Sequence, residues 1–286
     1  MKIGIIGGSG LYALEGIQDV EEISLSTPYG APSARYVSGR FNDREVVFLA
    51  RHGEGHRFIP SEIPFRANIW GFKSLGITHL IAVSAVGSLQ AHIAPGHIVI
   101  PDQFIDRTYL RESTFFGDGM VGHIQFGDPI CPRLIEVLSA SAQKVGARHH
   151  VGGTYICIEG PAFSTRAESN LYRGWGGSVI GMTNLQEAKL AREAEMCFAT
   201  IALATDYDCW HESEEEVNIE SVIKVMQDNI VTSKKILAEA VKTIDADRSC
   251  RCVNAMGDAL LTPLESIPES TREVMRPLIG RYLPKS

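Results

Sequence analysis

Two acidic residues, Asp206 and Asp208, directly follow an apolar run that is typical of a buried strand and is predicted at Thr200–Thr205. If the strand continues, residues two apart point to the same face, so the two carboxylates lie close together. They repel each other, and one is expected to keep its proton near neutral pH. Such a pair can donate one hydrogen bond and accept another, which matches the N7 and amine edge of adenine. Metal binding, with His211 nearby, and a solvated acidic loop are the alternatives.

A glycine-rich loop, GGSG at residues 7–10, follows the predicted strand Ile3–Ile6. Glycine permits close backbone approach, so the loop can direct N–H groups at an anion, and Ser9 adds a hydroxyl donor. Residues 8–13 also fit the dinucleotide fingerprint G-x-G-x-x-A. That fingerprint requires an acidic residue about 20 positions further on, and residues 24–41 contain none. A phosphate cradle is therefore favoured over a dinucleotide site and over a tight turn without a ligand.

Three further predicted strands end in residues suited to an anion. An arginine at a strand end can hold an oxyanion with two N–H groups, although a surface salt bridge is the alternative. Because ligands of α/β sheets gather at the C-terminal edges of strands, these residues are expected to form one anion site. They are Arg51 and His52 after Glu45–Ala50, Ser84 and Ala85 at the end of His79–Ser84, and Thr183 after Ser178–Met182.

Short strand-like runs alternate with amphipathic helical runs along the chain, which predicts an α/β fold. Two sequences, Thr165-x-x-Glu168 and Asn184-x-x-Glu187, each fit a helix capping box. Several strands are uniformly apolar, which indicates that both faces of the sheet are covered. The remaining predicted strands are His97–Pro101 and Gly153–Ile158, and helices are predicted to begin near Ser61, Pro132, Thr165, Thr183 and Asn218.

The composition is that of a globular, acidic protein. Of 286 residues, 44% are hydrophobic and 21% charged, and the formal charge is −7. No basic block favours a nucleic acid, no apolar run is long enough for a membrane span, and no secretory signal is recognised, so a cytoplasmic protein is expected. Residues 1–264 are predicted to form one domain. Residues 265–286 are predicted to form a C-terminal tail, in which Pro277 is expected to prevent one uninterrupted helix.

The six cysteines are spread thinly and include no pair of CxxC motifs, so no metal site is predicted. In a reducing cytosol, most of them are expected to be free thiols or small buried apolar residues.

Several segments of the chain together form a specific pattern, and they include GIIGGSGLY, LARHGEGHR, VSAVGSL, IEGPAFSTRAES, IGMTNLQEAKLA and ATDYDCW. They occur between about residues 2 and 263. In sequence and in order they resemble the methylthioadenosine phosphorylases, within the trimeric class of purine nucleoside phosphorylases. The resemblance implies a purine nucleoside phosphorylase-like fold, in which a mixed, twisted β-sheet or partial barrel is flanked by helices.

The resemblance also implies the reaction and the assembly. Phosphate would attack the ribosyl C1′ of S-methyl-5′-thioadenosine, releasing adenine and 5-methylthioribose 1-phosphate. Inorganic phosphate would be a co-substrate, and no cofactor would be needed. The family assembles as homotrimers, in some cases paired into hexamers, with each site at a subunit interface.

Single residues receive roles by the same resemblance. Phosphate would be held by Ser9, Arg51, His52, Ser84, Ala85 and Thr183. Met182 would lie against the ribose, Phe163 and Ser164 would border the purine, and the catalytic Asp206 and Asp208 would bind its N7 and 6-amino edge. The 5′-substituent would meet Ile219, Val222, Ile223, Leu260 and the neighbouring subunit's counterpart of His123. Two departures from the family pattern are Gln186, usually proline, and Ala162, commonly arginine.

Three questions stay open on the sequence. A 6-oxopurine nucleoside or methylthioinosine phosphorylase is an alternative. The 6-oxygen of such a purine is a hydrogen-bond acceptor, so ionised acids facing it would lose about 1–3 kcal/mol of binding free energy. A dinucleotide-dependent oxidoreductase is the alternative of a different class. Cys250-x-Cys252 resembles a CxC of some thermophilic relatives in which disulfides occur, while two reduced thiols are favoured here.

Overall fold

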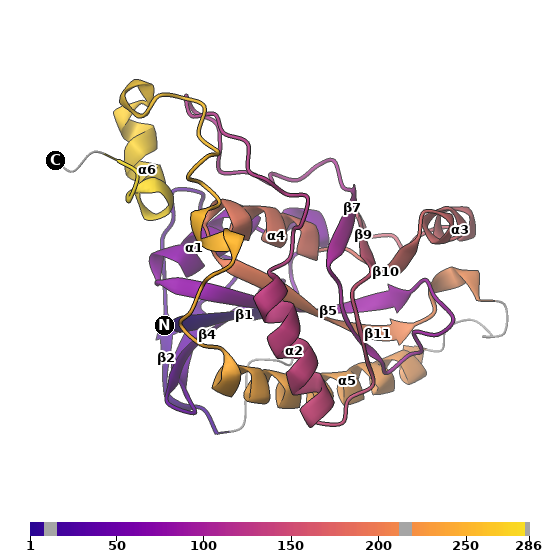
Figure 1. The fold of residues 1–286 in the computed structure, drawn as a ribbon. Coiled ribbons are helices and arrows are strands. Elements are labelled where there is room, and N and C mark those ends of the chain that lie inside the picture. The colour runs from indigo at the N-terminus through magenta and orange to yellow at the C-terminus, as the bar shows by residue number, and fades with distance from the viewer. Residues whose placement is uncertain (9–15, 212–218, 284–286) are drawn as a thin grey trace.

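The computed structural model describes residues 1–8, 16–211 and 219–283, without the side chains of 219–223. Ser9 and the side chains of Ile219, Val222 and Ile223 therefore lie outside the described residues. Within the described part, eleven strands form one mixed sheet flanked by six α-helices, which confirms the predicted α/β class (Figure 1).

The strand pattern is close to the prediction in the apolar segments and differs in the polar ones. Seven predicted strands are present, and β2, β3, β7 and β8 were missed. The side chains of β2 are almost all exposed, so its sequence QDVEEI carries no apolar signal. The strands are β1 Lys2–Gly7, β2 Gln18–Ile23, β3 Tyr36–Phe41, β4 Arg44–Ala50, β5 Ile77–Ser88, β6 Ile98–Ile100, β7 Gln103–Arg107, β8 His149–Val151, β9 Thr154–Ile158, β10 Gly177–Gly181 and β11 Cys197–Asp206.

The helices begin close to the predicted positions. The helix expected near Ser61 starts at Phe65, after a short 3-10 turn. The α-helices are α1 Phe65–Ser74, α2 Pro132–Lys144, α3 Arg166–Gly174, α4 Asn184–Glu193, α5 Ile219–Thr243 and α6 Glu269–Ile279, and the 3-10 helices are η1 Pro60–Glu62, η2 Asp208–Trp210, η3 Arg251–Asn254 and η4 Leu264–Ser266.

Strand β5 is the centre of the sheet and changes partners along its length. On one edge it pairs in parallel with β1 as far as Ala82 and then antiparallel with β10 from Gly87. On its other edge it pairs in parallel with β11. Residues 83–86 therefore lie between two successive partners, at a switch of strand direction of the kind where α/β sheets bind ligands. The prediction that the strand ends at Ser84 is wrong, because pairing with β11 continues to Gly87 and pairing with β10 reaches Ser88.

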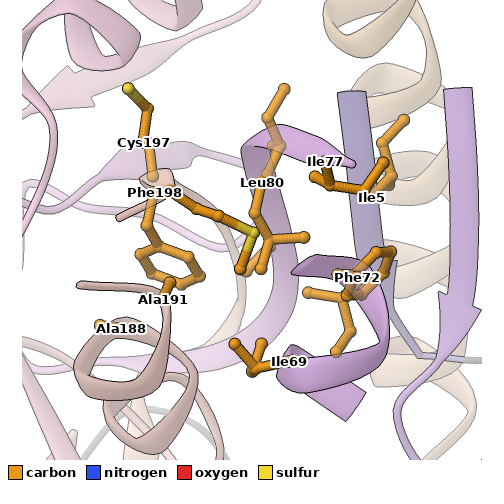
Figure 2. Packing of buried hydrophobic residues seen from close by; sticks show 14 of the residues in the cluster. Ile5, Ile69, Phe72, Ile77, Leu80, Ala188, Ala191, Cys197 and Phe198 are labelled. Carbon is orange, nitrogen blue, oxygen red and sulfur yellow. The ribbon is translucent and has the colours of Figure 1, made fainter. Parts of the chain in front are cut away.

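Helices cover both sides of the central strands, with α1 and α4 on one side and α2 and α5 on the other (Figure 1). The core between β5, β11, α1 and α4 is apolar (Figure 2). Burial of each such large side chain stabilises the fold by about 1.5–3 kcal/mol. The residues labelled there on these elements include Leu80, Phe198, Ile69, Phe72, Ala188 and Ala191.

One of the two predicted capping boxes is confirmed. The Thr165 hydroxyl accepts from the Glu168 N–H at 3.2 Å, and the Glu168 carboxylate accepts from the Thr165 N–H at 2.8 Å. The second box is wrong, because Thr183 is the N-cap of α4 and Asn184 is already helical. The Asn184 amide instead donates to the side chain of Glu187 at 3.1 Å.

The C-terminal segment packs against the rest of the chain. Met275, Leu278 and Ile279 of α6 are buried in the same apolar cluster as β1 and β5, and α6 contacts α1. Pro277 lies inside α6, so the expected interruption is wrong. It lies two residues before the end of the helix, so only Leu278 and Ile279 follow the hydrogen bond that proline cannot make. The boundary between 264 and 265 stays a prediction. No helix in the described segments has the length and apolar character needed to cross a bilayer.

Candidate active site

The C-terminal ends of β1 and β4 lie side by side. The backbone N–H of Arg51 donates to the carbonyl of Gly7 at 2.9 Å, which joins the residue after β4 to the last residue of β1. The predicted anion residues of these two strands therefore share one edge of the sheet. Ser9 follows directly, outside the described residues.

Arg51 is buried, with 2% of its surface exposed, and its guanidinium is engaged within the protein. Nε and Nη2 both donate to the carboxylate of Glu187, the Nη2 bond measuring 2.9 Å, and Nη1 donates to the carbonyl of Val83 at 3.0 Å. The two N–H groups that were expected to hold an oxyanion thus bind the carboxylate of Glu187. Because this ion pair is buried, the alternative of a surface salt bridge is wrong. Arg51 joins the end of β4 and the middle of β5 to the first turn of α4, which makes it a positioning residue.

His52 is half-buried and neutral at physiological pH. Burial, with the charges of Arg51 and His56 also contributing, lowers its pKa to about 4 despite a contact with the Phe58 carbonyl. Nδ1 lies 2.9 Å from that carbonyl oxygen, so in the neutral ring it carries the proton and donates it there. Nε2 is then an acceptor, which suits a protonated phosphate oxygen. The ring stacks on His56 at 4.2 Å between centroids.

Ser84 and Ala85 lie in the part of β5 between its two partners. The Ser84 hydroxyl is buried, 3.3 Å from the Tyr155 hydroxyl, while Ala85 is exposed. Thr183 is buried at the N-cap of α4, and its side chain makes no capping hydrogen bond. The first N–H groups of a helix favour an anion at this end. Through Arg51 and Glu187, the start of α4 is tied to the Ser84 segment.

Asp206 and Asp208 lie close together, although not as neighbours on one strand. Strand β11 ends at Asp206, and Asp208 begins a 3-10 turn with φ of 53°, so the strand does not continue to Asp208. The turn itself joins them, because the Asp208 N–H donates to Asp206 Oδ1 at 2.8 Å. Asp206 Oδ2 also accepts from the Thr205 hydroxyl at 2.7 Å. Both oxygens of Asp206 therefore receive hydrogen bonds that suit a carboxylate.

The pKa of Asp208 is raised, chiefly by burial and further by the negative charge of Asp206. A hydrogen bond from the Ser169 hydroxyl of α3, at 2.5 Å, opposes part of this shift. The two acids thus have different environments, as the expectation of one retained proton requires.

Gly87 of β5 lies against both acids. A Cβ atom at this position would be 3.1 Å from Asp206 Oδ1 and 3.3 Å from Asp208 Cβ. The neighbouring Ile180 side chain would also lie 3.1 Å away. A larger residue here would displace the acids, so the small residue next to the partner switch is part of the site.

The segment GPAFS at 160–164 lies beside the acids and Met182. The Cys209 thiol is 3.3 Å from the carbonyl oxygen of Ser164, and the Ser164 hydroxyl is buried without a hydrogen-bond partner. A Cβ on Gly160 would lie 2.5 Å from the Met182 sulfur, so the segment closes on Met182. Phe163 is 85% exposed, leaving its ring free to contact a ligand or a second chain.

Sequence reasoning missed a buried arginine that organises this region. Arg111 Nε donates to Glu159 at 3.0 Å, and Nη1 donates to the side chain of Gln186 at 3.0 Å and to the carbonyl of Met182. Gln186 in turn donates to the Thr108 hydroxyl at 2.6 Å, so this departure from the family pattern has a structural role. Nothing in the local sequence of Arg111 signals these contacts. Glu187 was likewise expected only as part of a capping box.

His123 and Leu260 lie together at a different place. The His123 N–H donates to the Ala259 carbonyl at 2.8 Å, and Gly122 forms a β-bridge with Leu260. His123 lines a cavity of about 770 Å³ whose walls include neither the two acids nor Thr183. Within the described part of a single chain, these two residues and the acid pair are therefore not brought together.

The chain is similar to known proteins over nearly its whole length. Residues 2–242 match the family model described as the phosphorylase superfamily. The S-methyl-5′-thioadenosine phosphorylase of Geobacter sulfurreducens is 57% identical over 282 residues, covering 98% of this chain and 99% of its own. The enzyme of the same name from Thermosynechococcus vestitus is 54% identical over 286 residues, covering 99% of each chain.

Solved structures agree with these matches. A methylthioadenosine phosphorylase from an Antarctic soil metagenomic library superposes with a TM-score of 0.93 at 45% identity, over 96% of this chain and 98% of that one. The methylthioadenosine phosphorylase of Schistosoma mansoni in complex with adenine has a TM-score of 0.85 at 36% identity, over 91% of this chain and 99% of that one. The chain therefore belongs to the phosphorylase superfamily and, within it, to the family of the S-methyl-5′-thioadenosine phosphorylases.

Proposed function

We propose that the protein cleaves S-methyl-5′-thioadenosine with inorganic phosphate, giving adenine and 5-methylthioribose 1-phosphate. The observation that carries this proposal is the pair Asp206 and Asp208, held in two different environments beside the GPAFS segment and next to the strand ends that suit an anion. The names of the relatives support the same reaction.

In the proposed mechanism, the glycosidic bond breaks through an oxocarbenium-like state, as in glycoside hydrolysis. Phosphate is the nucleophile, and its negative charge offsets the positive charge that develops on the sugar. The main chain and hydroxyls at residues 84–85, with Thr183 at the start of α4, would orient it. His52 Nε2 would accept a hydrogen bond from a protonated phosphate oxygen.

The leaving adenine needs a proton or a strong hydrogen bond at N7, which is the role proposed for Asp206. The two acids act as a coupled pair that carries one proton as adenine leaves. Burial raises the pKa of Asp208, which favours one proton on the pair, and the Asp208 backbone N–H orients Asp206, which would pass that proton to N7. The ionised carboxylate oxygens of the pair then accept hydrogen bonds from the 6-amino group of adenine. This is the reason for preferring a 6-aminopurine substrate.

The proposal includes a homotrimer or hexamer, a cytoplasmic location and no cofactor beyond the co-substrate phosphate. Two observations support active sites that are formed by residues of two subunits. Phe163 is largely exposed beside the acids, and His123 and Leu260 lie apart from the acids within one chain. Sedimentation equilibrium tests the assembly, and a monomer at the concentrations that give full activity would contradict it.

Adenine release from S-methyl-5′-thioadenosine, measured with and without phosphate, tests the reaction directly. We expect release that requires phosphate or arsenate, and much weaker cleavage of methylthioinosine and inosine. Preferential cleavage of the oxopurines would replace the proposal by a 6-oxopurine phosphorylase. Thermal stabilisation by a nicotinamide cofactor, with no adenine released, would replace it by the oxidoreductase alternative.

A further inference from the structure

Four of the six cysteines converge at one place, far from one another in the sequence. The sulfur atoms of Cys131, Cys197, Cys250 and Cys252 all lie within 4.8 Å of one another. The Cys197 and Cys250 sulfurs are 3.4 Å apart. In a tetrahedral site with metal–sulfur bonds of about 2.3 Å, the sulfurs are about 3.8 Å apart. The group is therefore compact enough to surround one ion with a small adjustment.

Three separate segments supply these sulfurs. Cys131 is the N-cap of α2, and its N–H donates to the Phe198 carbonyl at 2.9 Å, which places it beside the first residue of β11, Cys197. Cys197 points away from the side of β11 on which Phe198 packs (Figure 2). Cys250 and Cys252 come from the start of the 3-10 helix η3, more than fifty residues further along the chain. The group thus joins α2, β11 and the segment after α5.

We propose that Cys131, Cys197, Cys250 and Cys252 form a tetrahedral four-thiolate site for one zinc ion. A closed set of four sulfur ligands is the arrangement of structural zinc sites, in which the ion stabilises the fold and takes no part in catalysis. Binding releases the thiol protons, because only thiolates are ligands. The spacing Cys-x-Cys is shorter than the usual two to four intervening residues, and the other two ligands come from distant segments.

The surroundings of the sulfurs suit thiolates bound to a cation. The N-terminus of α2, a helix of thirteen residues, favours negative charge at Cys131. His79, which is buried, pairs with Cys197 in the register of β5 and β11, so a polar side chain borders this ligand, as is common around bound metals. Cys131, Cys197 and Cys252 are buried and Cys250 is partly buried, so solvent competes weakly for the ion.

A path for the ion is also present. Cys250 and Cys252 line the cavity of about 770 Å³, together with Ile130 and Pro132 next to the first ligand. The reaction proposed above does not involve this place, because none of its described residues borders the cavity apart from His123.

Two disulfides are the competing chemistry for four adjacent cysteines. A disulfide joins two sulfurs at about 2.05 Å and leaves the two pairs independent of each other. Mutual proximity of all four sulfurs is instead what a single central ion requires. The sequence prediction of no metal site rested on the absence of CxxC pairs, and it did not consider ligands brought together from three segments.

Metal content of the full-length protein tests the proposal. The protein is reduced, freed of metal by a chelator without oxygen, incubated with excess zinc and desalted. We expect one zinc ion per chain, released by a mercurial reagent that titrates the thiols. The double variant Cys250→Ser/Cys252→Ser should retain almost no zinc. Cys157→Ala, which removes another buried cysteine, should retain the full amount.

Cobalt binding to the wild-type protein keeps the test decisive if a cysteine variant fails to fold. Tetrahedral thiolate coordination should give intense visible bands and sulfur-to-metal charge-transfer bands, and zinc should displace them. Zinc should also raise the thermal midpoint of the reduced protein. Reduced wild type that binds neither metal, or a double variant that binds as much zinc as the wild type, would overturn the proposal. Intact mass showing two disulfides that re-form in the presence of zinc would also overturn it.

Discussion

At the scale of single residues, the two acids differ in their hydrogen bonds, and this difference is testable. Asp206 receives the Asp208 N–H and the Thr205 hydroxyl, so its position depends little on a ligand. Asp206→Asn removes the proton carrier proposed for N7 while keeping the size of the side chain.

We expect Asp206→Asn to lower kcat on S-methyl-5′-thioadenosine by about 10²- to 10⁴-fold, the usual contribution of a positioned acid. Phosphate binding, measured by calorimetry, should be unchanged. Asp43→Asn, at an exposed turn, is the matched control and should retain full activity. Unchanged turnover in Asp206→Asn would remove this residue from the mechanism.

His52 gives a prediction on pH and stability. Its pKa is about 4 in the folded protein against 6.5 for the ordinary side chain. Between these values the unfolded chain binds a proton that the folded protein does not, so stability decreases as the pH falls through this window. Below the pKa of the folded protein, His52 is protonated in both states, and its contribution to the free energy of unfolding is lost.

Urea unfolding across that pH window measures the effect. The free energy of unfolding of wild type should fall more steeply with decreasing pH than that of His52→Gln. Equal slopes for the two proteins would show that His52 does not carry the depressed pKa.

At the scale of elements, the buried pair of Arg51 and Glu187 joins the end of β4 and the middle of β5 to α4. Glu187→Gln leaves a buried guanidinium without its counter-charge, and we expect a loss of about 3–5 kcal/mol in the free energy of unfolding. Glu45→Gln breaks the exposed pair with Lys2 and should cost at most about 1 kcal/mol. Similar losses in the two variants, measured by urea unfolding, would contradict a positioning role for the buried pair.

The sequence predicted the apolar elements well, because strands buried on both faces are uniformly apolar and helices have periodic apolar positions. It missed β2 because an exposed edge strand has no such pattern. It ended at Ser84 a strand that in fact continues to Ser88, since partner choice along β5 depends on tertiary pairing. The contacts of Arg111 and Glu187, and the convergence of four cysteines, join segments far apart in the chain. No local pattern encodes them.

At the scale of the whole molecule, α6 contributes to the central core although it lies at the end of the chain. Met275 is buried, and its sulfur is 3.4 Å from the Tyr29 hydroxyl. We expect Met275→Ala to lower the free energy of unfolding by about 2–5 kcal/mol, as for other large buried side chains. Glu273→Ala, exposed on the same helix, should change it by less than about 0.5 kcal/mol. Equal midpoints for the two variants would show that the packing of α6 does not contribute to the stability of the core.

The change of partners along β5 has a consequence for how this enzyme can vary over evolutionary time. Where a strand passes from one neighbour to another, the path of the main chain creates the binding edge, and side-chain identity matters less. We therefore expect the exchange of one small side chain for another at Ala85 to leave the proposed binding of phosphate in place. Specificity for the rest of the substrate is free to diverge through the loops around it, while the anion end persists as an inherited property of the sheet's topology.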